Sequence, residues 1–393
     1  MSEKLVPKLR FVDESWDTQK LGNICKITMG QSPSSSNYSE NKEDTVLIQG
    51  NADLINGEVV PRVYTSEITK TSKPGDIILT VRAPVGDLAI NEFNSCIGRG
   101  VCSIEGDKFI YYFLQSLKDK HVWERLSQGS TFESINSNDI KNLKIKMPSE
   151  KTQKSISNFL TSIDIKIRLL EKKYDYYQDF KKFLMQQIFA QKLRFENGCS
   201  WNECTLGSIG ETYNGLSGLS KDNFEKGNSR YITYKSIFDN NILIEDLTEN
   251  VELNNKTQNN VKKGDLFFTG SSETPEEVGM VSVLTFNIDD CYLNSFCFGY
   301  RLKDTKTINP LFLAYYLRSP IMRNKIQILA QGSTRFNLSK KEILKLKIEI
   351  PSITEQLKII DLLQNTDKLI NNVSNQINEI NLFKKSLLQQ MFV

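Results

Sequence analysis

The 393-residue sequence is poor in the residues that hydrolytic catalysis and extracellular stability usually require. His121 is its only histidine, which argues against histidine-based hydrolysis and imidazole metal sites. Its seven cysteines are odd in number and form no tight pairs, so a reducing cytoplasm fits better than a disulfide framework. No apolar run approaches the roughly 20 residues that cross a bilayer, and the first residues lack the apolar segment of a secretory signal. We therefore expect a cytoplasmic protein with no membrane partner.

Several motifs of nucleotide chemistry are also missing. No glycine is followed by lysine, so the phosphate-binding loop of ATPases is absent and ATP hydrolysis is not expected. The Asn-Pro-Pro-aromatic signature of amino-methyltransferases is absent, since Asn309-Pro310 is followed by Leu311. The net charge of +3 is too small to indicate nucleic acid binding by itself, so a DNA-facing surface would need local segregation of charge.

Four of the cysteines form two pairs with the same five-residue gap. These are Cys96 with Cys102 and Cys291 with Cys297. Four thiolates are able to hold zinc, but structural zinc sites usually place two to four residues between neighbouring ligands. The four residues also lie in apolar, strand-like runs. The pattern therefore favours buried thiols over a zinc site, and we expect no metal or cofactor in this chain.

The sequence contains an internal repeat, which a series of matches in the same order establishes. The difference in residue number between matching residues of the two copies rises from 185 to 203 within the variable part of each half. It then stays at 203 to the end. The matches are Trp16/Trp201, Lys73–Asp76/Lys262–Asp265, Gln128–Thr131/Gln331–Thr334, Pro148/Pro351, Gln153/Gln356, Asp164/Asp367 and Gln186–Gln187/Gln389–Gln390. Each half is thus a globular unit with loops of variable length, followed by a constant element.

The constant element is predicted to be a long helix. Apolar residues recur at a mean spacing of 3.5, which is the pattern of a helix that packs along a partner helix. The expected packing positions are Ile156, Leu160, Ile163, Ile167 and Leu170 in the first copy, and Ile359, Leu363, Ile370, Val373 and Ile377 in the second. Ser352 and Glu355 have the spacing of a capping box at the second start. We expect the two helices to bury each other's apolar faces; the alternative is that each packs on its own domain.

The fold class expected is α+β. The globular parts look like mixed α/β domains, with strands at 77–81 and 88–90, helices at 109–117 and 310–317, and closing lysine-rich strands at 143–147 and 346–350. Two such domains, separated by two long antiparallel coiled-coil-like helices, would be related by a pseudo-twofold axis. The predicted ranges are 1–148 for domain 1, 149–197 for the first helix, 198–351 for domain 2 and 352–393 for the second helix.

The loops offer contact chemistry rather than catalysis. Arg82 follows the first Gly-Asp strand, whereas the second such strand leads into a loop four residues longer. Arginine forks onto guanine and glutamate accepts from cytosine, so different residues at one structural place suit two readers of different sequences. Hydroxyls and amides at the Gly-Ser-Thr turns commonly bind phosphate. The DNA-contacting candidates are Arg82, Arg99, Ser130, Thr131, Gly270, Ser271, Ser272, Glu273, Ser333, Thr334 and Arg335. For any single loop, ordinary turn chemistry is the competing explanation.

The order of these elements resembles the specificity subunits of type I restriction–modification systems over the whole chain. The resemblance lies in the opening Trp with Leu-Gly, the Gly-Asp strand, the Gly-Ser-Thr turn, and the Pro and Gln that lead into a long helix, all present twice. Pro351–Gln356 is particularly close to the family's helix entry, whereas the first copy has Thr152 where glutamate is usual, which costs a cap. No single motif is specific; the duplicated arrangement is.

The resemblance implies a recognition subunit without a catalytic site. Each domain would recognise one half of a split double-stranded DNA target, and the antiparallel helices would set the unread gap and dock two modification subunits. Two restriction subunits would complete the complex, with S-adenosylmethionine, ATP and Mg²⁺ on the partner subunits. The main alternative is a duplicated coiled-coil scaffold that binds proteins, and the missing motifs disfavour a self-sufficient methyltransferase or nuclease. The target bases do not follow from the sequence.

Overall fold

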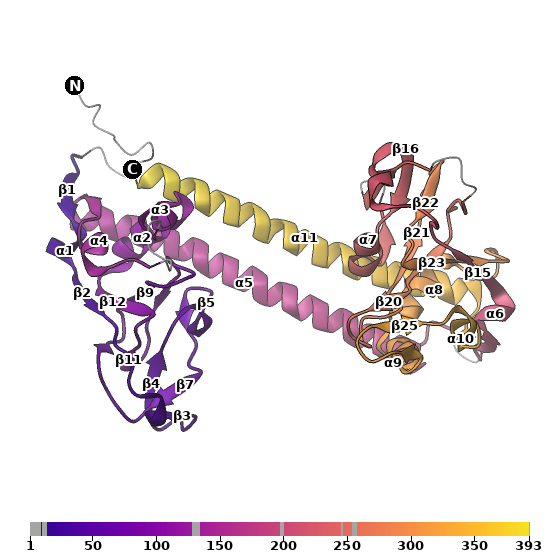
Figure 1. Cartoon of the computed structure of the whole chain (residues 1–393), viewed down its shortest axis with the longest axis horizontal. Coiled ribbons are helices and arrows are strands. Elements are labelled where there is room, and N and C mark those ends of the chain that lie inside the picture. The colour runs from indigo at the N-terminus through magenta and orange to yellow at the C-terminus, as the bar shows by residue number, and fades with distance from the viewer. Residues whose placement is uncertain are drawn as a thin grey trace. The chain divides into compact units, whose positions relative to one another are not determined.

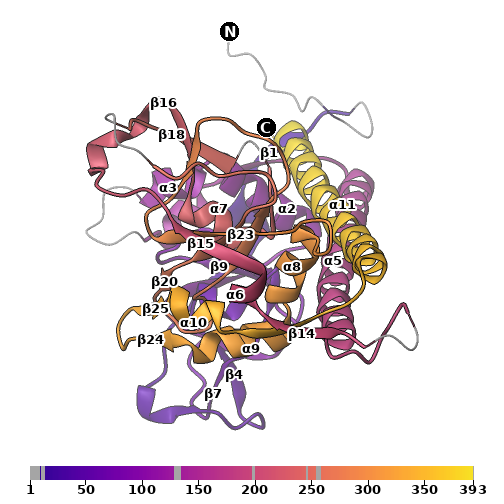
Figure 2. The ribbon, with the colours of Figure 1, turned by 90° about the vertical axis from the view of Figure 1, so that its right-hand side faces the viewer.

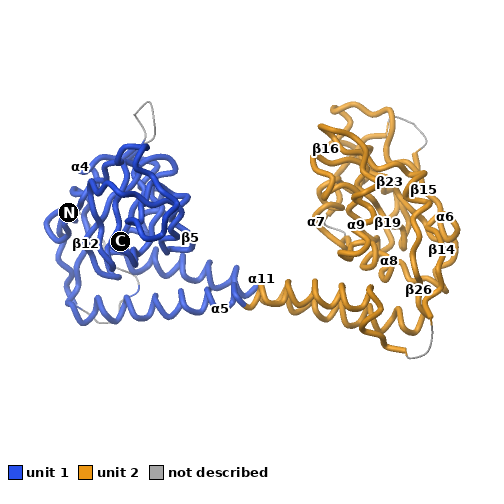
Figure 3. The backbone as a smooth tube through the Cα atoms, turned by 90° about the horizontal axis from the view of Figure 1, so that it is seen from below, with its two compact units in different colours: residues 1–172, 374–393 blue, residues 173–373 orange. Residues whose placement is uncertain are grey.

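The computed structural model describes residues 9, 14–127, 134–196, 200–244, 247–253 and 258–392. The chain forms two compact units, unit 1 with residues 1–172 and 374–393 and unit 2 with residues 173–373 (Figure 3). Each unit holds one globular domain together with parts of both long helices. The helices α5 (Glu150–Phe189) and α11 (Ile353–Met391) lie inside the two ranges expected for them.

The described residues of the domain of unit 1 form three sheets. Their strand orders are β2-β12-β9-β10-β6-β5, β3-β7-β4-β11-β8 and β1-β13. The elements are β1 (Asp17–Lys20), α1 (Leu21–Ile24), β2 (Lys26–Met29), β3 (Tyr38–Ser39), β4 (Thr45–Ile48), β5 (Leu54–Ile55), β6 (Glu58–Val59), β7 (Val63–Thr65), β8 (Thr71–Ser72), β9 (Ile77–Thr80), β10 (Leu88–Ile90), β11 (Ser95–Ile97), β12 (Val101–Glu105), α2 (Lys108–Asp119), α3 (Val122–Ser127), α4 (Ser137–Lys141) and β13 (Lys144–Met147).

The domain of unit 2 also begins with a strand and a short helix and ends with a short helix and a strand before a long helix (Figure 1). Its sheets are β15-β23-β19-β21-β17, β18-β16-β22, β20-β25-β24 and β14-β26. The elements are β14 (Asn202–Thr205), α6 (Leu206–Ile209), β15 (Gly210–Asn214), β16 (Phe224–Ile232), α7 (Tyr234–Asp239), β17 (Ile242–Leu243), β18 (Thr248–Val251), β19 (Leu266–Thr269), β20 (Ser271–Ser272), β21 (Val281–Leu284), β22 (Cys291–Leu293), β23 (Cys297–Leu302), α8 (Pro310–Leu317), α9 (Pro320–Ile328), β24 (Ala330–Gln331), β25 (Phe336–Leu338), α10 (Lys340–Leu344) and β26 (Lys347–Ile350). The strands and helices expected from the sequence are therefore present in both copies.

The four paired cysteines, Cys96, Cys102, Cys291 and Cys297, are buried thiols. Burial raises the pKa of Cys102 and of Cys297 to about 12, so both stay protonated at neutral pH. The matching five-residue gaps do not reflect structural equivalence, because the partner of Thr80 is Val101 whereas the partner of the equivalent Thr269 is Cys297. Among the described residues no group of histidine, cysteine and acidic side chains has an arrangement that could hold a metal ion. In the same part of the chain, no helix has the length and apolar character that a membrane span requires.

Each domain is packed against the first turns of one long helix and the last turns of the other. In unit 1 the core joins Phe109 of α2, Ile156 of α5 and Phe392 at the end of α11, with the two phenylalanine rings 5.2 Å apart. In unit 2, Phe312 of α8 and Phe189 of α5 take the equivalent places, with ring centroids 5.9 Å apart. The start of one helix thus accompanies the end of the other, so the helices run in opposite directions. Both expected modes of packing contribute, because each apolar face contacts a domain and the neighbouring helix.

The predicted packing positions are buried with one exception. Ile377 is half-buried, and the others are almost fully covered. The buried positions are Ile156, Leu160, Ile163, Ile167, Leu170, Ile359, Leu363, Ile370 and Val373. Burying one aliphatic side chain contributes roughly 1.5–3 kcal/mol, so these faces are a major part of each core.

Only half of the predicted capping box forms at the start of α11. The Ser352 hydroxyl accepts from the backbone N–H of Glu355 at 3.1 Å, as expected. The Glu355 carboxylate turns away from the helix start, where it accepts two bonds from Arg194 and one from the backbone N–H of Phe195. It also accepts from the indole N–H of Trp201 at 3.2 Å. The reciprocal bond of the capping box is replaced because a buried carboxylate gains more from a guanidinium than from one amide.

Candidate nucleic-acid interface

Domain 1 presents a hollow of about 590 Å³ that holds both of its arginine candidates. We name it the domain-1 hollow; its lining is Ser32, Pro33, Ser35, Tyr38, Gln49, Gly50, Asn51, Arg82, Ala83, Arg99 and Gly100. Arg82 and Arg99 are exposed, and neither guanidinium forms an ion pair with a carboxylate of the described residues. Two uncompensated guanidinium groups in one concave surface suit an anionic ligand.

Backbone packing keeps Arg99 at the surface. The Arg99 backbone N–H donates to the Ser32 hydroxyl at 3.1 Å. Gly100 lies close to the chain that leaves the end of β4, where an added Cβ would stand 2.1 Å from the carbonyl oxygen of Gln49. The turn therefore fits under β4 only with glycine at position 100, and the neighbouring Arg99 side chain is directed away from the core.

Domain 2 has a corresponding hollow of about 350 Å³, which we name the domain-2 hollow. Its lining is Asn214, Gly215, Leu216, Ser217, Gly270, Ser271, Ser295, Phe296, Cys297, Phe298, Asn337, Leu338 and Lys340. Strands β20 and β25 of the small sheet β20-β25-β24 contribute Ser271, Asn337 and Leu338 to this lining. Figure 2 shows the three strands beside one another. Two of the residues predicted from the sequence, Gly270 and Ser271, lie in this lining.

The backbone hydrogen bonds show that the two hollows occupy the same structural place. Arg82 forms a bridge to Ser134, and Ser271 pairs with Asn337, the counterpart of Ser134 in the second copy. Around them, Val81 N–H donates to the carbonyl of Gly100 at 2.9 Å, and Gly270 N–H donates to that of Phe296 at 2.8 Å. Arg82 is thus equivalent to Ser271, and Gly100 to Phe296. The expected arrangement of one frame with two sets of side chains is present.

The remaining predicted residues lie in different surroundings. Ser272 is only 8% exposed and donates its hydroxyl to Glu277 at 3.0 Å, whereas Glu273 is exposed. Exposed residues of the second Gly-Ser-Thr turn are Ser333, Thr334 and Arg335. The first such turn, with Ser130 and Thr131, lies outside the described residues. Whether any of these side chains contacts DNA stays a prediction.

Two residues of the domain-2 hollow, Phe296 and Lys340, did not emerge from the sequence. Phe296 is 55% exposed at the rim, and the predicted Arg335 lies with its guanidinium carbon 5.2 Å from the Phe296 ring centroid. Lys340 donates to the side-chain oxygen of Asn214, and burial lowers the pKa of Lys340 from its ordinary value. Identical residues gave no signal for Phe296, and only the strand register of the structure shows that it is equivalent to Gly100 of the first copy.

A cluster of tyrosine, aspartate and lysine joins each domain to both long helices. In unit 1 the Tyr112 hydroxyl donates to Asp164 at 2.7 Å, and Lys384 lies 2.5 Å from the same carboxylate. The Lys384 nitrogen also lies 5.5 Å from the centroid of the Tyr112 ring. Burial raises the pKa of Tyr112 far above its ordinary value, with a further contribution from the hydrogen bond to Asp164. The tyrosine therefore stays protonated and remains a donor at neutral pH.

The same cluster recurs in unit 2 at the equivalent positions of the second copy. Tyr315 donates to Asp367 at 2.6 Å, and Lys181 lies 2.5 Å from Asp367 and 5.6 Å from the Tyr315 ring centroid. Aspartate comes from the start of one helix and lysine from the end of the other in both units. We call these the Tyr–Asp–Lys clusters, and they fix how each domain sits on its helix pair.

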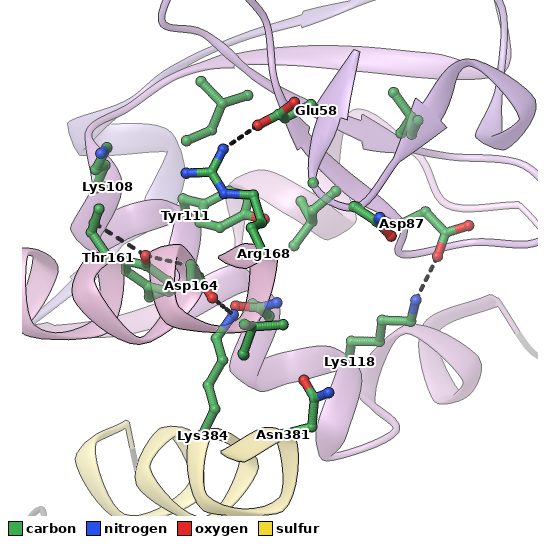
Figure 4. Close-up of a pocket in the computed structure, with 18 of the residues that line it drawn as sticks. Glu58, Asp87, Lys108, Tyr111, Lys118, Thr161, Asp164, Arg168, Asn381 and Lys384 are labelled. Carbon is green, nitrogen blue, oxygen red and sulfur yellow. Dashed lines mark hydrogen bonds and ion pairs between the residues drawn. The ribbon is translucent and has the colours of Figure 1, made fainter. Parts of the chain in front are cut away.

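Next to the first cluster lies a polar pocket of about 540 Å³ (Figure 4). Ion pairs cross it from Arg168 of α5 to Glu58 of β6 and from Lys118 of α2 to Asp87. Gln115 lines this pocket, and its equivalent in unit 2 is Arg318. The Arg318 guanidinium donates to four backbone carbonyls, those of Ile237, Phe238, Asn240 and Val281. Burial lowers its pKa to about 10. Domain 2 is thus braced by an internal guanidinium where domain 1 uses ion pairs between elements.

The chain belongs to the family of type I restriction modification DNA specificity domains, whose model matches residues 13–175 and 200–382. A Methanocaldococcus jannaschii protein, provisionally named the MjaX type I restriction enzyme specificity subunit, is 36% identical over 191 residues, 47% of this chain and 44% of that protein. The chain thus matches less than half the length of that relative. The MjaVIII specificity subunit of the same organism is 22% identical over 72% of this chain and 69% of its own length.

Two solved structures share the fold. The S subunit of a type I restriction–modification system from M. genitalium superposes with a TM-score of 0.58 at 18% identity, over 99% of both chains. A second structure comes from work on complex assembly and conformational transition of the type I R-M system. It superposes with a TM-score of 0.63, also at 18% identity, over 96% of this chain and 97% of that one. At this identity the likeness concerns the fold.

Proposed function

We propose that the chain is the DNA-recognition subunit of a type I restriction–modification complex and catalyses no reaction itself. Each domain recognises one half of a split double-stranded target in the cytoplasm. The single observation that carries this is the pair of hollows, which share one backbone frame but differ in side chains. A scaffold that binds one protein twice would keep the same side chains, whereas two readers of different half-sites need different ones.

Two modification subunits are the proposed partners on the helices. Phe180 of α5 and Phe383 of α11 occupy equivalent positions in the two copies and are 39% and 53% exposed. Tyr176, 64% exposed, stacks beside Phe180 with the rings 6.3 Å apart. An exposed aromatic at equivalent places on both helices offers the same anchor twice, and such anchors dominate protein interfaces. S-adenosylmethionine would then reside on the modification subunits, and ATP and Mg²⁺ on two restriction subunits.

The test is the methylation pattern of a host strain that carries variants of this chain together with its modification subunit. Arg82→Ala should relax or abolish recognition of one half-site, because a lost base contact typically costs ~1–3 kcal/mol. The half-site of domain 2 should stay unchanged. Arg62, an arginine of the same domain outside the hollow lining, provides the control Arg62→Ala.

Two results would contradict the proposal. If Arg82→Ala weakened binding of the modification subunit while the methylated motif stayed unchanged, the hollow would be an assembly surface. If the complex with the modification subunit bound duplex DNA with no sequence preference and no salt dependence, the protein scaffold would be the better explanation.

A further inference from the structure

Phe296 is held at the rim of the domain-2 hollow by its backbone. It lies in the turn between β22 and β23, where its N–H donates to the side-chain oxygen of Asn294 at 2.9 Å and its carbonyl accepts from Gly270 at 2.8 Å. Gly270 permits this approach, since an added Cβ would stand 2.7 Å from that carbonyl oxygen. Both backbone groups are therefore occupied, and the ring stays 55% exposed instead of folding into the core.

The fold itself does not require an aromatic residue here. The equivalent position in domain 1 is Gly100, which forms the matching hydrogen bond to Val81 with no side chain at all. Single exposed apolar residues are common on protein surfaces and usually mean nothing. This one lines a concave surface that corresponds to the two-arginine hollow of domain 1. Its place in that hollow separates it from an exposed residue such as Ile328, which lies on α9.

Arg335 covers one face of the Phe296 ring. Its guanidinium carbon lies 5.2 Å from the ring centroid, the geometry of a cation–π contact. The turn that delivers it depends on Gly332, whose φ is +133° and whose added Cβ would meet the carbonyl of Arg335 at 2.1 Å. With one face covered, the ring offers its edge and its other face to a ligand.

We propose that Phe296 recognises a thymine in the half-site of domain 2 by contact with its 5-methyl group, with Arg335 as the positioning residue for the ring. This rests on the proposed function. The thymine methyl is the apolar feature of the major-groove base edges, and phenylalanine is one of the side chains that contact it. The arginines at the equivalent hollow of domain 1 instead suit guanine. The two hollows would thus recognise different bases, guanine in domain 1 and thymine in domain 2.

The experiment measures duplex binding by the complex of this chain with its modification subunit. First, the methylation motif of the host identifies the half-site that Ser271 and its neighbours recognise, through the change caused by Ser271→Arg. Each thymine of that half-site is then replaced by deoxyuridine, which removes only the methyl group. At one position the wild-type complex should lose about three- to fivefold in affinity, the value of one buried methyl. Phe296→Ala should bind both duplexes equally at that position.

Variants of Arg335 and a control complete the test. Arg335→Gln should reduce the preference for thymine over deoxyuridine. Arg335→Lys should reduce it as well, because lysine keeps the charge but lacks the planar face. Ile328→Ala, which removes an exposed apolar side chain outside the hollow, should keep the full preference. Circular dichroism melting verifies that each variant is folded, and Phe296→Leu replaces Phe296→Ala if the alanine variant is not.

Distinct outcomes overturn the inference and the function on which it rests. A half-site without thymine, or a wild-type complex indifferent to every methyl group, overturns the thymine contact while specific binding persists. An equal loss for Phe296→Ala on all duplexes shows that the ring stacks on a displaced base or contacts the backbone instead. Absence of specific binding by the wild-type complex overturns the proposed function itself.

Discussion

At the scale of single residues, the two copies differ clearly at the entry to their long helices. Glu355 and Thr152 occupy equivalent places, and so do Trp201 and Trp16. The indole N–H of Trp201 donates to Glu355, whereas that of Trp16 is buried with no hydrogen-bond partner among the described residues. In unit 1 the carboxylate comes from Glu14, which accepts from the backbone N–H of Ser149 at 3.1 Å and leaves the indole unsatisfied. The expected loss of a cap at Thr152 is therefore wrong, because the Ser149 hydroxyl accepts from the Thr152 N–H and Glu14 replaces the missing carboxylate. What the exchange of glutamate for threonine leaves is a buried indole donor without a partner among the described residues.

Glu355→Ala should destabilise unit 2 by about 3–5 kcal/mol at neutral pH, because the largely buried guanidinium of Arg194 loses the carboxylate that neutralises it. Burial raises the pKa of Glu355, but the bonds from Arg194, Phe195 and Trp201 outweigh this and lower it below 4.5. The contribution is therefore complete above pH 4.5 and is lost as the pH falls through the folded-state pKa. Urea denaturation from pH 7 to pH 3 should show the wild-type and variant stabilities converging in acid.

The control for this variant is Glu203→Ala in the same unit. Glu203 pairs with Lys347 at 2.8 Å, but both side chains are more than half exposed. Surface pairs of this kind contribute little to stability, because water and salt screen them. A loss of similar size in both variants would show that burial of the Glu355 carboxylate has no special weight.

Thr366→Val should be tolerated, with a change in unfolding free energy below about 1 kcal/mol, because the lost hydroxyl has a partner only inside its own helix. Thr366 is 3% exposed, and its hydroxyl donates to the carbonyl of Leu362 at 2.9 Å. The equivalent residue in the first copy is Ile163, which shows that an aliphatic side chain suits this place. Ile163→Asn, the reverse kind of change, should cost several kcal/mol through an unpaired buried amide. Equal stability of the two variants in urea would refute burial of this helix face.

At the scale of elements, the helices were predictable because their information is local. Spacings of three and four residues among Ile156, Leu160 and Ile163 identify the buried face without knowledge of its partner. The hollows were only partly predictable, because each gathers segments far apart in sequence. Arg82, Arg99 and Tyr38 meet only after β9 has paired with β12 in one sheet and β3 and β4 have both paired with β7 in another. Strand register is not written in local spacing.

The Tyr–Asp–Lys clusters give a matched pair of variants. Asp164→Asn and Asp367→Asn each leave a largely buried lysine, Lys384 at 11% and Lys181 at 21% side-chain exposure, without its counter-ion. Each should cost about 1–3 kcal/mol. The double variant should lose the sum, because the clusters lie in different units and share no residue. Calorimetry on the three variants measures these losses. A loss confined to one cluster would show that the two equivalent clusters do not contribute equally to stability.

At the scale of the whole molecule, the two long helices carry equal lengths of chain between the two clusters. The stretch from Asp164 to Lys181 on α5 is as long as the stretch from Asp367 to Lys384 on α11. This common register places Tyr177 opposite Asn371, so a change in the length of one helix alone would break one of the clusters. The helix pair is therefore expected to change length only when both helices change together.

Four residues inserted after Tyr177, and four more before Asn371, should lengthen the helix pair by roughly 6 Å. Since one base pair spans ~3.4 Å, the unread gap in the methylated target should grow by one or two base pairs while both half-sites stay the same. Methylation mapping in the host provides the measurement. Paired insertions of two residues, which rotate each helix by about 200°, and the single four-residue insertion should both abolish methylation. An active paired variant with the original gap would show that the helices do not set the spacing.

The composition of unit 1 from two separate parts of the sequence has a consequence for synthesis on the ribosome. Unit 2 is one continuous stretch, whereas the core of unit 1 includes Leu388, Met391 and Phe392 from the far side of the sequence. Domains commonly fold as they emerge, so unit 2 is able to complete its core before unit 1 does. In nascent chains that end at residue 373 and carry a C-terminal linker long enough to clear the ribosome exit tunnel, unit 2 should therefore be protected from protease and domain 1 should be open to cleavage. Domain 1 would wait, incompletely folded, for a segment that the ribosome makes only after the whole of unit 2.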